Sequence, residues 1–215
     1  MARDVDADVD LHLDFGASAD RMDVEHVCRR TDEHRYGGRV AIGHVTKATS
    51  LAVADFDAMA KRLAGAGVAL TVLPATDLYL MGRHHTHDHN ATRGVVPAHK
   101  LIRHGVNCSL STNNVLNPFT PFGDCSQIRM ANLYANVCHV GSAADMRACF
   151  DMVTRRPAQL MRITDYGIAV GHPADLVVLD ASAPETAVAE LAPVLYAFKR
   201  GRMTVSRQPA RLHRP

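Results

Sequence analysis

Short apolar segments and helical segments alternate along the first half of the chain, and this rhythm limits the possible fold more than any other feature. The predicted strands cover residues 5–15, 39–46, 68–74 and 106–111, and the predicted helices cover residues 23–35, 51–64 and 98–104. Strand and helix units joined by short glycine-containing turns build a parallel sheet, because each helix returns the chain to the same end of the sheet. Four strands are too few to close a barrel of eight. We therefore predict an α/β fold, an incomplete (β/α)8 TIM-type barrel.

The second half of the sequence changes character. Helical spacing continues at residues 127–140, 143–154 and 157–163, and two strand-like segments follow at 174–180 and 194–205, the second with a Gly-Arg turn. We therefore predict three parts. Residues 1–163 form the barrel part, residues 164–206 form an accessory β layer, and residues 207–215 form a loose tail rich in Arg and Pro.

Composition and charge exclude several classes of function. The chain has 215 residues, of which 47% are hydrophobic and 21% charged, so it can bury a globular core. Its 24 Lys and Arg residues are scattered and nearly balanced by 22 Asp and Glu residues, so no nucleic-acid-binding surface is predicted. No apolar run is long enough for a membrane span, and the acidic start does not look like a signal peptide. We expect a cytoplasmic protein with neither a nucleic acid nor a membrane partner.

The five cysteines show no CxxC pair, so we expect reduced thiols in apolar surroundings and not a disulfide framework or a zinc cluster.

Histidines are unusually frequent, and two of them follow the predicted strands. His12 and His44 lie near the ends of the first and second strands, and the carboxyl ends of parallel strands line one face of a barrel. Imidazole is a common ligand of divalent ions and a ready proton carrier. The alternative is that each histidine only forms hydrogen bonds at a strand end. The His-rich segment at residues 84–89 is predicted to be a solvated loop near the mouth of the site, although such segments can also bind metal.

Several motifs resemble the cytosine deaminase group of the amidohydrolase superfamily, which includes isopropylammelide aminohydrolase. They are His12-Leu13-Asp14, Gly43-His44-Val45-Thr46, the segment from Gly105 through Asn113 and Asn114 to Gly123, and the segment at residues 165–179. The spacing of His12 and His44 fits the family without a gap. The resemblance implies strands five to eight of the barrel, followed by the return into the accessory β domain.

The resemblance also implies roles for individual residues. His12 takes the position of the strand-five metal ligand, and His44 that of the strand-six histidine, which holds the attacking water or the substrate. Phe119 lies where the family places an aromatic ring against the heterocycle, and Asn114 where it has a carboxylate that helps to hold the substrate. The implied activity is metal-dependent hydrolysis of a C–N bond in a nitrogen heterocycle. The implied cofactor is a divalent ion, zinc or iron.

Three departures from the family pattern affect the chemistry. Asn113 replaces the strand-eight aspartate, which binds metal and acts as a base, and a neutral amide cannot take up that proton. Phe15 replaces the glutamate of the deaminases, and Asp14 is a candidate to supply a carboxylate instead. The His-x-His of strand one is not among these residues, so the sequence is expected to be a fragment that is inactive alone.

These departures lead to two expectations about partners and to two alternative functions. The expected partners are a small heterocyclic substrate and either a separate N-terminal half or further copies of this chain. One alternative function is a non-catalytic remnant or binding subunit that keeps the pocket without the chemistry. Another is cyclic amide hydrolysis of the dihydroorotase type, which requires a metal-bridging lysine on strand four.

Overall fold

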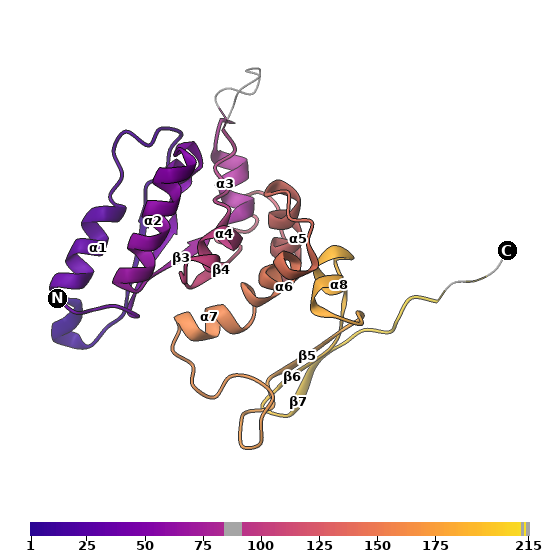
Figure 1. The fold of residues 1–215 in the computed structure, drawn as a ribbon. Helices are drawn as coiled ribbons and strands as arrows, with labels where there is room; N and C mark the ends of the chain where they lie inside the picture. Colours follow the sequence, from indigo (N-terminus) through magenta and orange to yellow (C-terminus); the bar gives the residue numbers. More distant parts are fainter. Residues whose placement is uncertain (84–91, 212, 214–215) are drawn as a thin grey trace.

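Two sheets of different character organise the chain in the computed structural model, which describes residues 1–83, 92–211 and 213 (Figure 1). The first sheet is parallel, in the order β1 (Val9–Leu13), β2 (Val40–His44), β3 (Val68–Val72) and β4 (Cys108–Leu110). The second is antiparallel, in the order β5 (Leu176–Leu179), β6 (Val194–Lys199) and β7 (Arg202–Ser206). The predicted mixed α/β fold with a parallel sheet is confirmed.

Helices connect and flank the strands. They are α1 (Val24–Glu33), α2 (Val53–Ala66), α3 (Pro74–Leu80), α4 (Ala98–Arg103), α5 (Gln127–Val137), α6 (Ala143–Asp151), α7 (Arg155–Leu160) and α8 (Pro184–Ala189), with short 3-10 turns at Ala2–Val5 and Thr46–Ser50. Two of them, α3 and α8, were not predicted from the sequence. The first strand is shorter than predicted because the chain starts with a 3-10 turn. Within the described residues, no helix has both the length and the apolar character needed to cross a bilayer.

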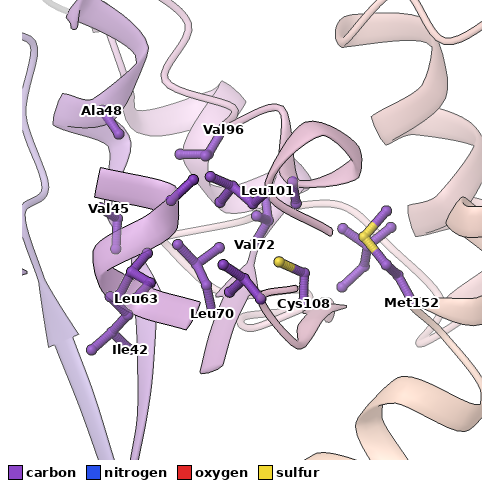
Figure 2. Packing of buried hydrophobic residues seen from close by; sticks show 14 of the residues in the cluster. Ile42, Val45, Ala48, Leu63, Leu70, Val72, Val96, Leu101, Cys108 and Met152 are labelled. Atoms are coloured by element: carbon purple, nitrogen blue, oxygen red, sulfur yellow. The ribbon is translucent and has the colours of Figure 1, made fainter. Parts of the chain in front are cut away.

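The core lies between the parallel sheet and its helices. Ile42 on β2, Leu70 on β3 and Cys108 on β4 are paired in register and fully buried. They pack with Leu63 of α2 and Leu101 of α4, which are also fully buried (Figure 2). Burying one such aliphatic side chain contributes roughly 1.5–3 kcal/mol, so this layer accounts for much of the stability of the sheet.

The opposite face of the same strands carries a different row of residues. His12 is paired with Gly43, Gly43 with Thr71, and Thr71 with Ser109. Because side chains alternate between the faces of a strand, this row points away from the helix-facing core residues. The hydroxyl groups of Thr71 and Ser109 lie 2.9 Å apart and hydrogen-bond to each other. His12 therefore belongs to a polar row on the sheet face opposite the core.

The accessory sheet ends in a tight hairpin. Arg200 and Gly201 both have positive φ, 48° and 76°, which is the pattern of a type I′ turn between antiparallel strands. The turn therefore lies at Arg200–Gly201, one residue earlier than the predicted Gly-Arg turn, and β7 already begins at Arg202. Helix α8 packs against α5 and α6, and its Val188 belongs to the main buried cluster. The boundary between residues 163 and 164 stays a prediction.

Candidate functional site

His12 and His44 come together at the carboxyl ends of two neighbouring strands. His12 is the fourth residue of β1 and His44 the last of β2, and their ring centroids lie 4.8 Å apart with the rings nearly perpendicular. Gly43 makes room for this arrangement, since a Cβ atom there would lie only 3.3 Å from Cδ2 of His12. The expected meeting of the two imidazoles is therefore present in the structure.

The backbone is strained where β2 ends. His44 and Val45 have positive φ values of 69° and 51°, and both residues are buried. A β-branched residue rarely adopts this left-handed conformation, which costs of order 1–3 kcal/mol and persists only where the surroundings impose it. Such outliers concentrate at functional sites, and this one sets the direction in which His44 leaves the sheet.

Asp77 of α3 is the partner of His44. Its Oδ1 lies 2.6 Å from Nδ1 of His44, and its Oδ2 accepts a hydrogen bond of 3.2 Å from the backbone N–H of Leu73. The carboxyl group is completely buried, and this burial raises its pKa, while the hydrogen bond to His44 acts in the opposite direction. Sequence reasoning missed Asp77 because it missed α3. The available signal was Pro74 at a helix start with an acidic residue in the first turn.

Phe15 covers the other side of His44. Its ring centroid lies 5.4 Å from that of His44 in an edge-to-face arrangement, and 43% of the residue is exposed. Where the resemblance places a glutamate in the deaminases, this chain has an apolar ring in contact with the strand-end histidine. Phe15 cannot supply a proton, so acid catalysis from this position is not available.

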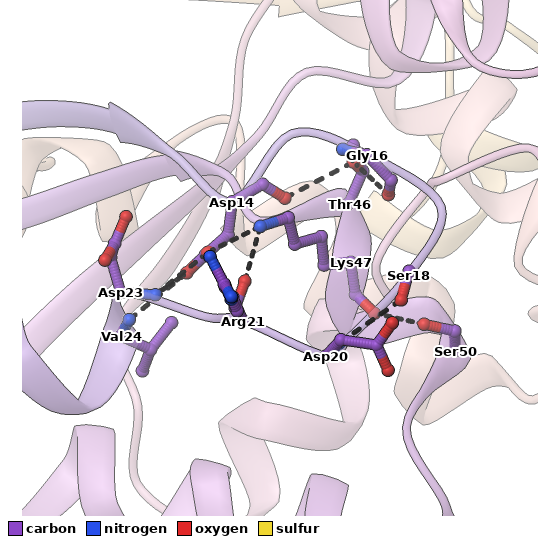
Figure 3. Close-up of polar contacts among 10 residues, drawn as sticks. All are labelled: Asp14, Gly16, Ser18, Asp20, Arg21, Asp23, Val24, Thr46, Lys47 and Ser50. Atoms are coloured by element: carbon purple, nitrogen blue, oxygen red, sulfur yellow. Dashed lines mark hydrogen bonds and ion pairs between the residues drawn. The ribbon is translucent and has the colours of Figure 1, made fainter.

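Asp14 has a structural role, and not the role of a substitute catalytic carboxylate that the sequence suggested as a candidate (Figure 3). Its carboxylate accepts hydrogen bonds from the backbone N–H groups of Asp23, at 2.9 Å, and Val24, at 3.1 Å, and lies 3.6 Å from Nζ of Lys47. These N–H groups begin α1 and have no partner within the helix. Asp14 therefore caps α1 and does not serve as the substitute carboxylate considered from the sequence.

The segment after β4 carries the other three candidates. Asn113 lies three residues beyond Leu110, is exposed, and has a φ of 56°, a conformation that Asn tolerates well. Oδ1 of Asn114 accepts a hydrogen bond of 2.7 Å from Asn117, and Phe119 is 59% exposed. Among the described residues, no hydrogen bond joins Asn113, Asn114 or Phe119 to the two histidines. Their convergence on one site stays a prediction.

Two further features border this segment. The buried hydroxyl of Thr120 hydrogen-bonds to Thr76 of α3 at 2.6 Å, so the loop that carries Phe119 is attached to the helix that carries Asp77. A cavity of about 780 Å³ adjoins the loop, and Asn114 contributes to its wall together with the aromatic pair Tyr79 and Phe122.

The described residues do not form a complete metal site. His12 and His44 offer two imidazole groups, but no group of three or more His, Cys, Asp or Glu side chains within residues 1–83, 92–211 and 213 is arranged to hold an ion. The His-rich segment at residues 84–89 lies outside the described residues. A divalent ion would therefore need ligands beyond those that the structure describes.

Comparison with known proteins places these features in a family. Residues 1–206 match the amidohydrolase family. The chain is 30% identical to a pterin deaminase of Rhizobium rhizogenes over 81% of the chain and 39% of that enzyme. It is 27% identical to an N-isopropylammelide isopropyl amidohydrolase of Pseudomonas sp. over 95% of the chain and 47% of that enzyme. The chain thus spans less than half the length of these two relatives.

Solved structures agree with the sequence comparison. A 5-methylcytosine deaminase of Klebsiella pneumoniae, liganded with 5-fluorocytosine, superposes with a TM-score of 0.92 and 26% identity over 100% of the chain and 52% of that protein. An atrazine chlorohydrolase of Arthrobacter aurescens, complexed with zinc, shares the fold with a TM-score of 0.63 and 19% identity over 96% of the chain and 46% of that protein. The family match over nearly the whole chain and the shared fold lead to one conclusion: this chain belongs to the amidohydrolase family.

Proposed function

We propose that this chain supplies the C-terminal part of a metal-dependent hydrolase that cleaves a C–N bond of a nitrogen heterocycle. The observation that carries the proposal is the contact of His12 with His44 at the carboxyl ends of β1 and β2, backed by the buried Asp77. Active sites of barrel enzymes lie on this face. The two deaminases and the amidohydrolase to which the chain is similar support the reaction class, since each name describes hydrolysis at a C–N bond.

The residues of the chain have distinct tasks in this proposal. His12 is one donor to a divalent ion, zinc or iron, and His44 holds the attacking water or the substrate. Phe119 stacks on the flat heterocycle, and the amide of Asn114 hydrogen-bonds to its edge. When bound, such an ion would lower the pKa of a water molecule, so that a hydroxide nucleophile is available near neutral pH. The remaining ligands come from residues that the structure does not describe, either on a longer polypeptide or on a partner chain.

A chimera tests the proposal. The matching part of the Klebsiella 5-methylcytosine deaminase is replaced by residues 1–206 of this chain. Release of ammonia is measured with cytosine, 5-methylcytosine and pterin, and release of isopropylamine is measured with N-isopropylammelide. We expect turnover of at least one compound and a loss of at least about 100-fold in His44→Ala. His26→Ala is the matched control, because His26 is exposed on α1 and hydrogen-bonds only to Arg29 among the described contacts. A chimera that melts cooperatively but releases neither ammonia nor isopropylamine from any of the four compounds contradicts the proposal.

One observation favours a second candidate, a non-catalytic binding subunit. Three positions where the resemblance implies acids carry Asn113, Asn114 and Phe15, and the described residues gather no set of three metal ligands. Calorimetric titration of the chain with the same four compounds separates the candidates. Binding without turnover in the folded chimera supports the subunit, whereas turnover excludes it.

A further inference from the structure

We infer that Asp77 is a positioning residue that fixes the Nδ1-protonated tautomer of His44, so that Nε2 is left as the hydrogen-bond acceptor of the site. An ionised carboxylate can only accept hydrogen bonds, so the 2.6 Å contact with Oδ1 requires a proton on Nδ1 of His44. Nε2 lies on the far side of the ring and faces away from Asp77. The consequence for catalysis rests on the proposed function, whereas the tautomer itself does not.

The surroundings of Asp77 hold the carboxylate in one place. The side chain is fully buried, and its second oxygen accepts the N–H of Leu73, the residue that precedes α3. Asp77 lies in the first turn of that helix, so its position follows from the helix and not from a flexible side chain. The 2.6 Å bond to His44 and the bond from Leu73 both favour the ionised carboxylate and so oppose the cost of burying it.

His44 is restrained on its other sides as well. The ring of His12 lies against it at 4.8 Å between centroids and that of Phe15 at 5.4 Å, both edge to face. Neither ring offers a carboxylate that could compete with Asp77 for the proton on Nδ1. Among the described hydrogen bonds of His44, the bond to Asp77 is therefore the one that can select the tautomer.

The same helix turn also reaches the loop expected to contact the substrate. Thr76, next to Asp77, hydrogen-bonds to Thr120, which follows Phe119 directly in the sequence. Helix α3 therefore connects the orientation of His44 with the position of the expected stacking ring. Displacing Asp77 would act on the histidine directly, whereas displacing Thr76 would act on the loop.

Long-range 1H–15N correlation spectra of the 15N-histidine-labelled chain at about pH 8 test the inference without any activity. The signals of His44 are identified by their loss in His44→Gln. We expect a protonated Nδ1 and an unprotonated Nε2 for His44 in the unsubstituted chain, and conversion to the Nε2-protonated form in Asp77→Asn and Asp77→Ala. Asp57→Asn is the matched control, because Asp57 pairs with His104 at the surface, 3.2 Å from Nε2, and its loss should leave His44 unchanged.

The spectra alone can overturn the inference. An Nε2-protonated His44 in the unsubstituted chain contradicts it even if no Asp77 variant folds, and so do unchanged His44 signals in both folded variants. Asp77→Glu keeps a carboxylate and should retain part of the Nδ1-protonated population.

The activity of the chimera provides a second test of the positioning role of Asp77. We expect Asp77→Asn to lower kcat by about 10-fold or more, with little change in KM and partial recovery in Asp77→Glu; removing the hydrogen-bond partner of a metal-binding histidine costs about 10- to 100-fold, and removing the carboxylate behind a catalytic general-base histidine costs more. An inactive chimera with the expected tautomer contradicts the proposed function but leaves the positioning role intact. An active chimera whose kcat is unchanged in Asp77→Asn, although the tautomer has shifted, contradicts the positioning role.

Discussion

At the scale of single residues, Gly43 controls how closely His12 can lie against the second strand. An added Cβ atom would lie 3.3 Å from Cδ2 and 3.7 Å from Nε2 of His12, so the ring must move by a few tenths of an ångström. We expect Gly43→Ala to lower kcat/KM of the chimera by about tenfold or more, with little change in melting temperature, since positioning errors of this size are costly in catalysis.

Gly65→Ala on α2 is the control, because its Cβ atom would meet nothing within 4 Å. It should stabilise the helix by roughly 0.5–1 kcal/mol and leave turnover unchanged. Equal activities of the two variants would show that the His12 position does not matter.

The substitution Asn113→Asp tests whether the candidate site can gain a charged ligand at this position. Its φ of 56° is tolerated by Asp as well as by Asn, so Asn113→Asp should fold without added backbone strain. If Asn113 faces the two histidines, the new carboxylate should increase zinc retention of the chimera by about tenfold and raise turnover. Elemental analysis after gel filtration measures retention, and Asn136→Asp on the exposed side of α5 is the control. Loss of an existing activity in Asn113→Asp would mean that the asparagine itself is part of the mechanism.

At the scale of elements, the start of α1 depends on Asp14 more than on its own first residues. Asp14→Ala removes the acceptor for two backbone N–H groups and the carboxylate beside Lys47. We expect a loss of about 1–3 kcal/mol in the free energy of unfolding, measured by urea denaturation. Asp20→Ala, in the exposed loop before α1, should cost less than about 0.5 kcal/mol. Equal losses for both variants would remove the capping role.

The elements also show what the sequence could and could not predict. The first parallel strand was predicted from its alternation of apolar and acidic residues, and the next three were predicted from short apolar runs that follow glycines. Helix α3 was missed because the predicted strand was extended through Leu73 and Pro74. Asp77 on that helix was therefore missed too, since only its contact with His44 reveals its role. Asp14 was a candidate to supply the missing carboxylate because it lies two residues beyond His12 on the same strand parity. Its true partners lie nine and ten residues further along the chain and are brought back by the loop.

At the scale of the whole molecule, burial divides the five cysteine thiols into four with a raised pKa and one that is exposed. It raises the pKa of Cys28 to about 11 and the pKa values of Cys108, Cys138 and Cys149 to about 12, so few of these groups are ionised at pH 8. Cys125 is exposed. We expect a disulfide reagent to modify one thiol rapidly in the native chain and four more only after unfolding. The rapid phase should disappear in Cys125→Ser, and several rapid phases would contradict the burial pattern.

The open edge of the parallel sheet bears on the behaviour of the isolated chain. In the described sheet β1 pairs with β2 on one side only, and β1 is partly exposed along its length. Because an unpaired edge strand is a template for association, we expect the chain alone to self-associate at micromolar concentrations. Light scattering after size-exclusion chromatography measures this, with the chimera as the comparison. A sharp monomer peak with cooperative melting would refute the expectation.

The alternation of the two rows on the central strands has a consequence for how such a protein can diversify. Ile42, Leu70 and Cys108 on one face hold the sheet to its helices, while the row on the other face, formed by His12, Gly43 and Thr71, contributes His12 to the candidate site. Neighbouring positions of one strand thus serve different purposes. One set of positions stabilises the fold, and the other set carries residues that bear on the reaction. The residues that hold the sheet to its helices and the residue types that carry chemistry therefore lie on opposite faces of the same strands, an arrangement in which one scaffold can host different reactions.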